Sequence, residues 1–180
     1  LALRKFITKV NDTQVTNRIP VFTNVKDKNG NYIYEHTKEP VEVESTDIVE
    51  YTLRIYNEGD IAGYAKEVKD DIPEGLEYLW DDGIEYNTDG SINWDNVTKE
   101  FTAEEKEAIE FNFDNGWSYA GDSTLKTIKT DYLSRDNETI PGDGSNLIKA
   151  FGNNDGTKTE ADISYKEVSV KLKVVSEDVT

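Results

Sequence analysis

The 180-residue chain contains no cysteine and no methionine, and His36 is its only histidine. Without cysteine there are no disulfides, no thiolate metal ligands and no cysteine nucleophile. A Ser-His-Asp triad would have to use His36, which lies in a charged segment, and no G-x-S-x-G motif supplies a nucleophile. We therefore expect a protein that is not an enzyme and that binds no cofactor and no metal ion.

Long apolar runs and positive charge are also scarce. No apolar stretch approaches the roughly 18 residues of a membrane-spanning helix, so we expect no membrane insertion of this segment. The chain has 20 Lys and Arg residues and 37 Asp and Glu residues. Its net charge of -17 disfavours nucleic acid and anionic membranes as partners. The lack of an initiating methionine suggests a mature or excised piece of a longer protein.

The clearest positive signal is the segment 47–57, in which apolar and polar residues alternate. The apolar set is Val49, Tyr51, Leu53 and Ile55, and the polar set is Glu50, Thr52 and Arg54. A period of two predicts a β-strand with one buried face. Asp47 shares the apolar register, and we interpret it as an inward-pointing acid. Such a carboxylate needs a partner, because an unpaired buried charge is costly.

Short strands and tight turns account for most of the remaining chain. We expect strands at 1–10, 20–24, 32–34, 41–43, 61–69, 76–80, 123–133 and 163–175, and a short apolar turn or strand at 146–151. Asn29-Gly30 predicts a hairpin turn, and the capping box from Thr102 to Glu105 predicts a helix at 103–110. This helix and a second hairpin lie in an insertion at about 81–118. The pattern indicates a single all-β sandwich domain over residues 1–180 with one short helix.

The alternating strand and the turn that follows it match a known repeat. The residues are Asp47-x-Val49-x-Tyr51-x-Leu53-x-Ile55-x-Asn57-x-Gly59, followed by DIPEGLEY at 71–78. This pattern resembles the repeat of Gram-positive surface proteins of the collagen-adhesin and pilin-backbone type. The stretches LALRKFITKVN, TDYLS and NLIKAF are similar to the variant found in clostridia. Thr46 stands where the repeat usually has glycine, and the 81–118 insertion is not covered.

The resemblance implies a fold, a location and a function. The fold is an immunoglobulin-like β-sandwich. The module is structural or adhesive and belongs to an extracellular surface or fimbrial protein that is attached to the cell wall of a Gram-positive bacterium. Its partners are neighbouring domains of the same surface protein and a host matrix protein or glycan.

Many domains of this family form an internal isopeptide bond between a lysine on the first strand and an asparagine on the last, assisted by a buried acid. The resemblance implies Lys5 as the nucleophile and Asp47 as the proton shuttle. Apolar neighbours on the same face of the strand would favour the neutral, reactive amine of Lys5. No asparagine follows Asn154. The acceptor is therefore expected beyond residue 180, and Asp178 is the candidate within the chain.

Simpler interpretations stay open for these residues. The amine of Lys5 could reach solvent while its stem packs, and Lys9 is an alternative nucleophile. Asp47 could cap backbone N–H groups at the entry to the strand, or form a buried but non-covalent ion pair with Lys5. The Asn-Gly and Asp-Gly pairs are interpreted as turns, because none completes a calcium-binding loop.

Aromatic residues in the insertion suggest a second function. Trp94 and Trp117, with tyrosines around them, could form a platform on which a sugar stacks. They could equally be anchors of the core. The alternative to a structural module is therefore a glycan- or host-protein-binding module that uses the 81–118 insertion.

Overall fold

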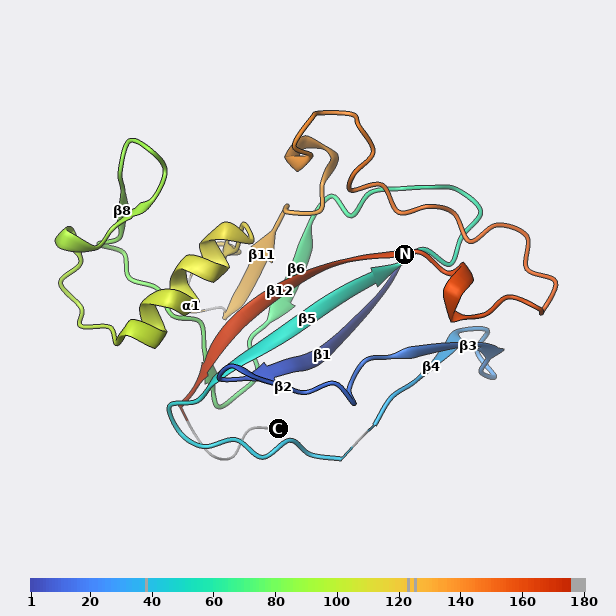
Figure 1. The fold of residues 1–180 in the computed structure, drawn as a ribbon, viewed down its shortest axis with the longest axis horizontal. Coiled ribbons are helices and arrows are strands. Elements are labelled where there is room, and N and C mark those ends of the chain that lie inside the picture. Colours follow the sequence, from blue (N-terminus) through green and yellow to red (C-terminus); the bar gives the residue numbers. More distant parts are fainter. Residues whose placement is uncertain (38, 123, 125, 176–180) are drawn as a thin grey trace.

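The computed structural model describes residues 1–37, 39–122, 124 and 126–175, which form mostly antiparallel β-strands and one α-helix. The largest sheet has the strand order β2-β1-β5-β12-β7. Figure 1 shows β1, β5 and β12 running side by side through the middle of the molecule. The bounds are Ala2–Val10 for β1, Thr13–Gln14 for β2, Ile48–Tyr56 for β5, Leu76–Glu77 for β7 and Tyr165–Val174 for β12.

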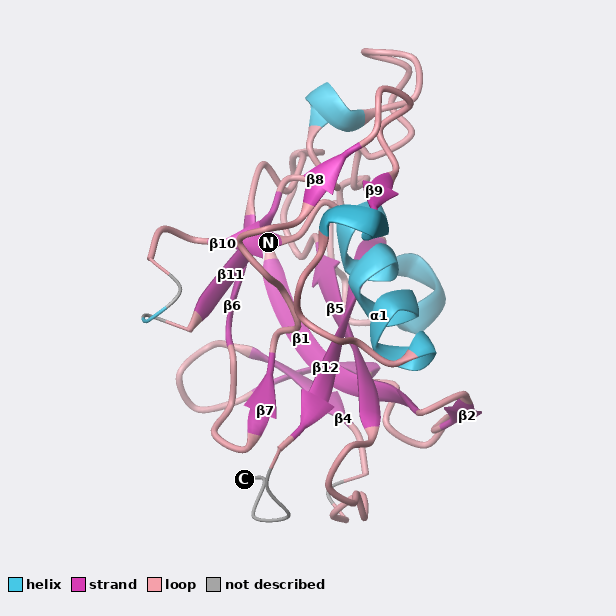
Figure 2. Cartoon of the chain, turned by 90° about the vertical axis from the view of Figure 1, so that its left-hand side faces the viewer, coloured by secondary structure: helices cyan, strands magenta, loops and turns pink. Residues whose placement is uncertain are grey.

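A smaller sheet packs against this one and shares its core (Figure 2). It consists of β10 (Ser118–Tyr119), β11 (Thr127–Thr130) and β6 (Val68–Asp71), in that order. Val68 and Ile128 from the small sheet meet Leu53, Val168 and Val170 from the large one in a single buried cluster. The expectation of a predominantly β chain is thus confirmed.

The central strand β5 is buried on both faces, so the prediction that its polar face is exposed was wrong. Glu50, Thr52 and Arg54 are all at most 7% exposed. They form polar contacts across the sheet: Thr52 bonds to Ser169 on β12 at 2.8 Å, and the Arg54 guanidinium donates to Glu167 at 3.0 Å. A hydrogen-bonded polar row can be covered at little cost, which alternation in sequence cannot reveal.

The hairpin and helix signals are both confirmed. The hairpin joins β3 (Val21–Lys26) to β4 (Tyr32–Glu35), and its ladder has an irregular register. The helix α1 spans Ala103–Asp114, about one turn beyond its predicted end, and its capping box between Thr102 and Glu105 is complete. It packs with a two-stranded sheet of β8 (Glu85–Tyr86) and β9 (Ile92–Asn93) around a separate small core. Turns of 3₁₀ helix lie at Trp94–Asn96, Arg135–Asn137 and Glu160–Asp162.

Several predicted strands are shorter than expected or unpaired. The segment 61–69 joins a sheet only from Val68, and in the described part of 123–133 only β11 is a strand. In 146–151 only Ile148 forms a bridge, to Gly63. The segment 40–44 is not assigned to any strand, although Val41 and Val43 are half-buried between exposed glutamates. Side-chain alternation is present there without a neighbouring strand to pair with.

Candidate functional site

Lys5 lies between the two sheets and contacts a carboxylate that the sequence did not single out. On β1 it stands opposite Leu53 of β5. Its Nζ is 2.7 Å from Oδ2 and 2.9 Å from Oδ1 of Asp70 on β6. The same amine lies 4.6 Å from the centre of the Tyr51 ring. The ion pair therefore ties the large sheet to the small one.

The environment of Asp70 changes its acidity. Its side chain is 9% exposed, whereas that of Lys5 is 23% exposed. Burial raises the pKa of Asp70 above its ordinary value, although the neighbouring Lys5 amine opposes this rise. A carboxyl group with a raised pKa, in contact with an amine, can exchange a proton with it. Asp70 shares the register of Val68. Had the predicted strand been extended from residue 69 to 71, that register would have indicated Asp70.

Asp47 does not point into the core, so its predicted partnership with Lys5 was wrong. It precedes β5, and its carboxylate accepts hydrogen bonds from the Glu44 N–H at 2.8 Å and from Asn11 Nδ2 at 3.1 Å. Lys5 pairs with Leu53, six residues along the strand, which places Asp47 about 20 Å away. The alternative interpretation, an acid that caps backbone N–H groups at the strand entry, agrees with these contacts.

The other expected members of the crosslinking site are not brought to Lys5. In its row of the sheet, β12 presents Val168 across Leu53. Asp178 lies outside the described residues. Lys9 lies opposite Glu50, past a bulge in β1. Lys5 and Asp70 are thus the two groups of the site that the structure brings together.

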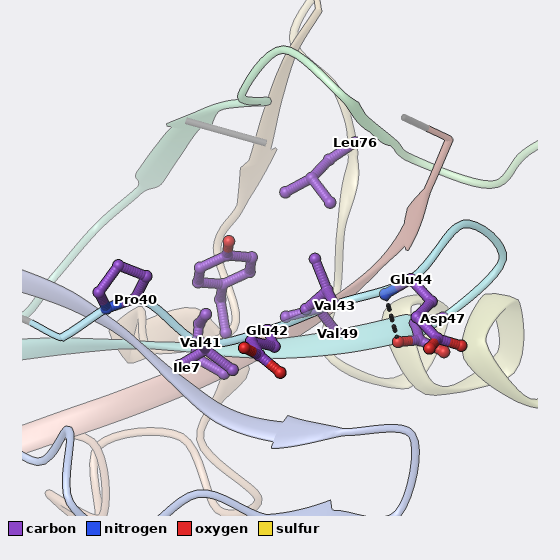
Figure 3. A pocket seen from close by; sticks show the side chains of 10 residues that line it. Ile7, Pro40, Val41, Glu42, Val43, Glu44, Asp47, Val49 and Leu76 are labelled. Carbon is purple, nitrogen blue, oxygen red and sulfur yellow. Dashed lines mark hydrogen bonds between the residues drawn. The ribbon is translucent and has the colours of Figure 1, made fainter. Parts of the chain in front are cut away.

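A pocket of about 950 Å³ opens beside Ile7, in the second half of β1, between the sheet and the segment 40–44 (Figure 3). Ile7, Val43 and Val49 line its floor, and Leu76 lies across the opening from Val41 and Val43. Acidic side chains stand at its rim. Within the described ranges, no group of three or more His, Asp or Glu side chains is placed to hold a metal ion.

The two tryptophans proposed as ligand contacts lie apart and make internal contacts. Trp117 is 3% exposed, and its indole N–H donates to the Ser169 carbonyl at 2.7 Å. Trp94 is half-buried and donates to Glu110 at 2.7 Å, with its ring against Phe101. Both geometries are those of anchors.

Trp117, together with five other rings, surrounds an open cavity of about 270 Å³. The aromatic lining residues are Tyr78, Trp80, Tyr86, Phe113, Trp117 and Tyr119. Tyr86 is 49% exposed and stacks on Phe113 with ring centroids 4.8 Å apart. The sequence identified the aromatic character of the insertion but not which rings are accessible.

No helix in the described part of the chain is long and apolar enough to cross a membrane. No family model, no curated protein and no solved structure matches the chain. The interpretation of its function therefore rests on its residues and their geometry.

Proposed function

We propose that this chain is a structural and adhesive module of a bacterial cell-surface or fimbrial protein, built as an immunoglobulin-like sandwich on the outside of a Gram-positive cell. The resemblance of residues 47–59 and 71–78 to the surface-protein repeat supports this proposal. So do the two antiparallel sheets with a common core. Neighbouring domains of the same surface protein are its expected partners, and a host matrix protein is a further one.

The position of β1 and β12 on either side of β5 carries the proposal. Both strands are antiparallel to β5, so they run parallel to each other. A pull on the start of β1 and on the end of β12 acts along the strands in opposite directions. The hydrogen bonds lie perpendicular to the strands, so both ladders are loaded in shear and resist together. The ion pair between Lys5 and Asp70 adds a tie between the sheets.

Pulling single molecules from two directions tests this role. The chain has no cysteine of its own, so handles can be attached to cysteines introduced at chosen positions. Handles at Leu1 and Val175 load β1 and β12 in shear. Handles at Leu1 and Asp60 instead peel β1 from β5, beginning at the Ala2–Tyr56 pair. We expect clearly higher unfolding forces in shear, and equal or lower forces would contradict the proposal.

Within this proposal, Lys5 is the nucleophile of an isopeptide bond, and Asp70 takes the proton-shuttle role assigned to Asp47 from the sequence. Attack of the Lys5 amine on a side-chain amide forms a secondary amide and releases ammonia. Attack on an aspartic acid forms the same linkage and releases water. A carboxyl with a raised pKa can deliver the proton that the leaving group needs.

Intact-mass measurement tests the crosslink. We expect the full unmodified mass for these 180 residues, because Val168 fills the facing position on β12. A longer polypeptide that supplies an asparagine should lose one ammonia, and Lys5→Arg and Asp70→Ala should both prevent this loss. Asp47→Ala is the matched control and should leave it unchanged. A crosslink that needs Asp47 but not Asp70 would contradict the assignment.

The aromatic cavity at the insertion supports glycan or host-protein binding as a second candidate function. Sugars stack on accessible ring faces, and Tyr86 and Trp80 provide such faces beside the cavity. On a glycan array, Tyr86→Ala should abolish a signal that Tyr132→Ala, at a similarly exposed tyrosine elsewhere, preserves. A signal that both variants retain, or no signal from the unaltered chain, would reject this alternative for glycans.

A further inference from the structure

The small sheet stops short of β1. Leu3 stands opposite Ile55, yet Leu3 is 44% exposed and Ile55 only 5%. Leu1, two residues before it, is 63% exposed. In the next row Leu53 is completely buried, whereas the side chain of Lys5 is 23% exposed. The residues of β5 on this face are therefore covered, whereas those of the neighbouring strand β1 are partly exposed.

The strand of the small sheet that lies nearest to β1 has an unpaired edge. Asp70 on β6 contacts Lys5, and among the described strands β6 pairs only with β11. The preceding residues, Tyr64 to Glu67, make no backbone–backbone hydrogen bond to another described residue. We call residues 64–71 the β6 edge. An open edge of this kind is a template for an added strand.

A cavity of about 410 Å³ separates the β6 edge from β1. Its lining comprises Leu1, Leu3, Ile55 and residues 64–69. One wall offers backbone hydrogen-bonding groups, and the other offers leucine side chains. A strand meets both needs at once, because its backbone pairs sideways while every second side chain points to one face.

The charge around this groove differs from that of the chain as a whole. The charged side chains that line it are those of two lysines, Lys66 and Lys69, and one glutamate, Glu67, in a protein of net charge -17. Lys66 and Lys69 are exposed at the β6 edge, where Glu67 lies 3.5 Å from Lys69. Acidic side chains on an incoming strand can pair with the exposed ammonium groups of Lys66 and Lys69.

The molecule covers the opposite end of β1 with a segment of that composition. Ile7 lies under residues 40–44, whose sequence is Pro-Val-Glu-Val-Glu. Val41 and Val43 are half-buried there, whereas Glu42 and Glu44 are exposed. This extended segment illustrates which side-chain pattern suits the inner face of β1.

We infer that the groove between β1 and the β6 edge binds an extended strand of a partner polypeptide, with apolar residues at every second position and acidic residues between them. The strand pairs with the backbone of residues 64–71 and covers Leu1 and Leu3. Its carboxylates face Lys66 and Lys69. This inference is independent of the proposed surface function, since it rests on the open edge, the exposed leucines, the two lysines and the pattern of residues 40–44.

Titration with a labelled peptide tests the inference. The probe is an end-blocked peptide of about eight alternating valine and glutamate residues, matching the length of the β6 edge. We expect saturable binding in fluorescence anisotropy, with amide NMR shifts concentrated in residues 64–71. The same peptide with N-methylated backbone amides should not bind, because it cannot donate to an edge strand. Equal binding of the methylated peptide, or no binding of the unmethylated one, would overturn the inference.

Matched variants locate the site. Leu3→Asp should weaken binding by about tenfold or more. Val21→Asp should not, because Val21 is similarly exposed, at 43%, but lies on β3. Replacing both Lys66 and Lys69 by glutamate should weaken binding of the acidic peptide. It should strengthen binding of a peptide in which lysine replaces each glutamate. Unchanged affinity in the Leu3 and lysine variants would place the peptide elsewhere. Sedimentation that shows dimers of the unliganded chain, lost in Leu3→Asp, would assign the groove to a second copy and also overturn the inference.

Discussion

The large sheet is closed in different ways at the edge of β12 and at the edge of β1. On the β12 side, helix α1 replaces a neighbouring strand: the side-chain amide of Asn112 donates to the Lys171 carbonyl at 2.8 Å and accepts from the Lys171 N–H at 2.7 Å. Trp117 donates to the next outward carbonyl, that of Ser169. On the β1 side, β2 pairs only with Lys9 and Val10. Side chains can therefore satisfy an edge as a strand does, whereas in the described part of the chain the outer edge of β1 meets another strand only at its end.

The helix that closes the β12 side is held in place at its first turn. Glu105 closes the capping box with Thr102 and also accepts from Lys173 of β12 at 3.1 Å. Although partial burial opposes it, hydrogen bonds from Thr102 and Lys173 lower the pKa of Glu105. These contacts orient the helix so that Asn112, fully buried on it, reaches the strand.

Shortening one leucine on each side should show the difference between the two sides most strongly. Leu172 on β12 is completely buried, so Leu172→Ala should cost about 2–5 kcal/mol of the free energy of unfolding. Leu3→Ala on β1 should cost no more than about 1 kcal/mol, because Leu3 is already 44% exposed. Urea denaturation measures both. Similar losses for the two variants would show that β1 is covered after all.

Removing the Asn112 amide should give the next largest effect. Asn112→Ala leaves the N–H and carbonyl of Lys171 without their partner, which should cost about 2–4 kcal/mol. It should also speed hydrogen exchange at the Lys171 amide. Glu107→Ala, at an exposed position of the same helix, controls for changes in helix propensity and should stay within about 0.5 kcal/mol. Unaltered exchange at Lys171 would argue against this role of Asn112.

A substitution on the covered side should increase stability. Thr46, whose N–H pairs with the Val174 carbonyl, has a φ of 79°, a conformation that β-branched residues rarely adopt. Thr46→Gly should raise the free energy of unfolding by about 1 kcal/mol in thermal or urea denaturation. Thr46→Ala retains a Cβ and should give less. If alanine stabilises as much as glycine, relief of backbone strain is not the cause.

The smallest expected effect concerns the ion pair at the open side. Because the pKa of Asp70 is raised in the folded state, its contribution to stability is full below its ordinary pKa of 3.8. That contribution is lost as the pH rises through the folded value. The stability of the natural chain minus that of Asp70→Asn should therefore increase as the pH falls toward 3.8. Other carboxylates cancel in this difference. The opposite trend would mean that Lys5 outweighs burial.

Local signals predicted a good part of the fold. Alternation located β1, β5 and β12, Asn29-Gly30 located the hairpin, and the Thr102 capping box located the helix. Each of these signals depends on residues that are close together in the sequence. The strand predictions for the segments 40–44 and 61–67 failed because a strand needs a neighbour to pair with. The alternating pattern of a segment does not reveal whether such a neighbour is there.

The candidate site was predicted only by half. The inward register of Lys5 followed from the apolar residues around it. Its partner, Asp70, was missed because the strand that carries it was predicted to end at residue 69. Asp47 was assigned by counting back in steps of two from Val49, but β5 begins only at Ile48, and the positive φ of Thr46 marks a turn just before Asp47. Register counting is valid only within a continuous strand.

The sequence by itself determined where β1, β5 and β12 lie and where the helix begins, and it favoured an inward register for Lys5, because backbone propensity and periodicity act over a few residues. Only the tertiary structure decided that Asp70, 65 residues away, meets Lys5. It also decided that α1 closes β12 and that the inner face of β1 stays partly uncovered. These outcomes depend on how the small sheet and the helix settle on the large sheet, and that is decided by contacts between segments far apart in the chain.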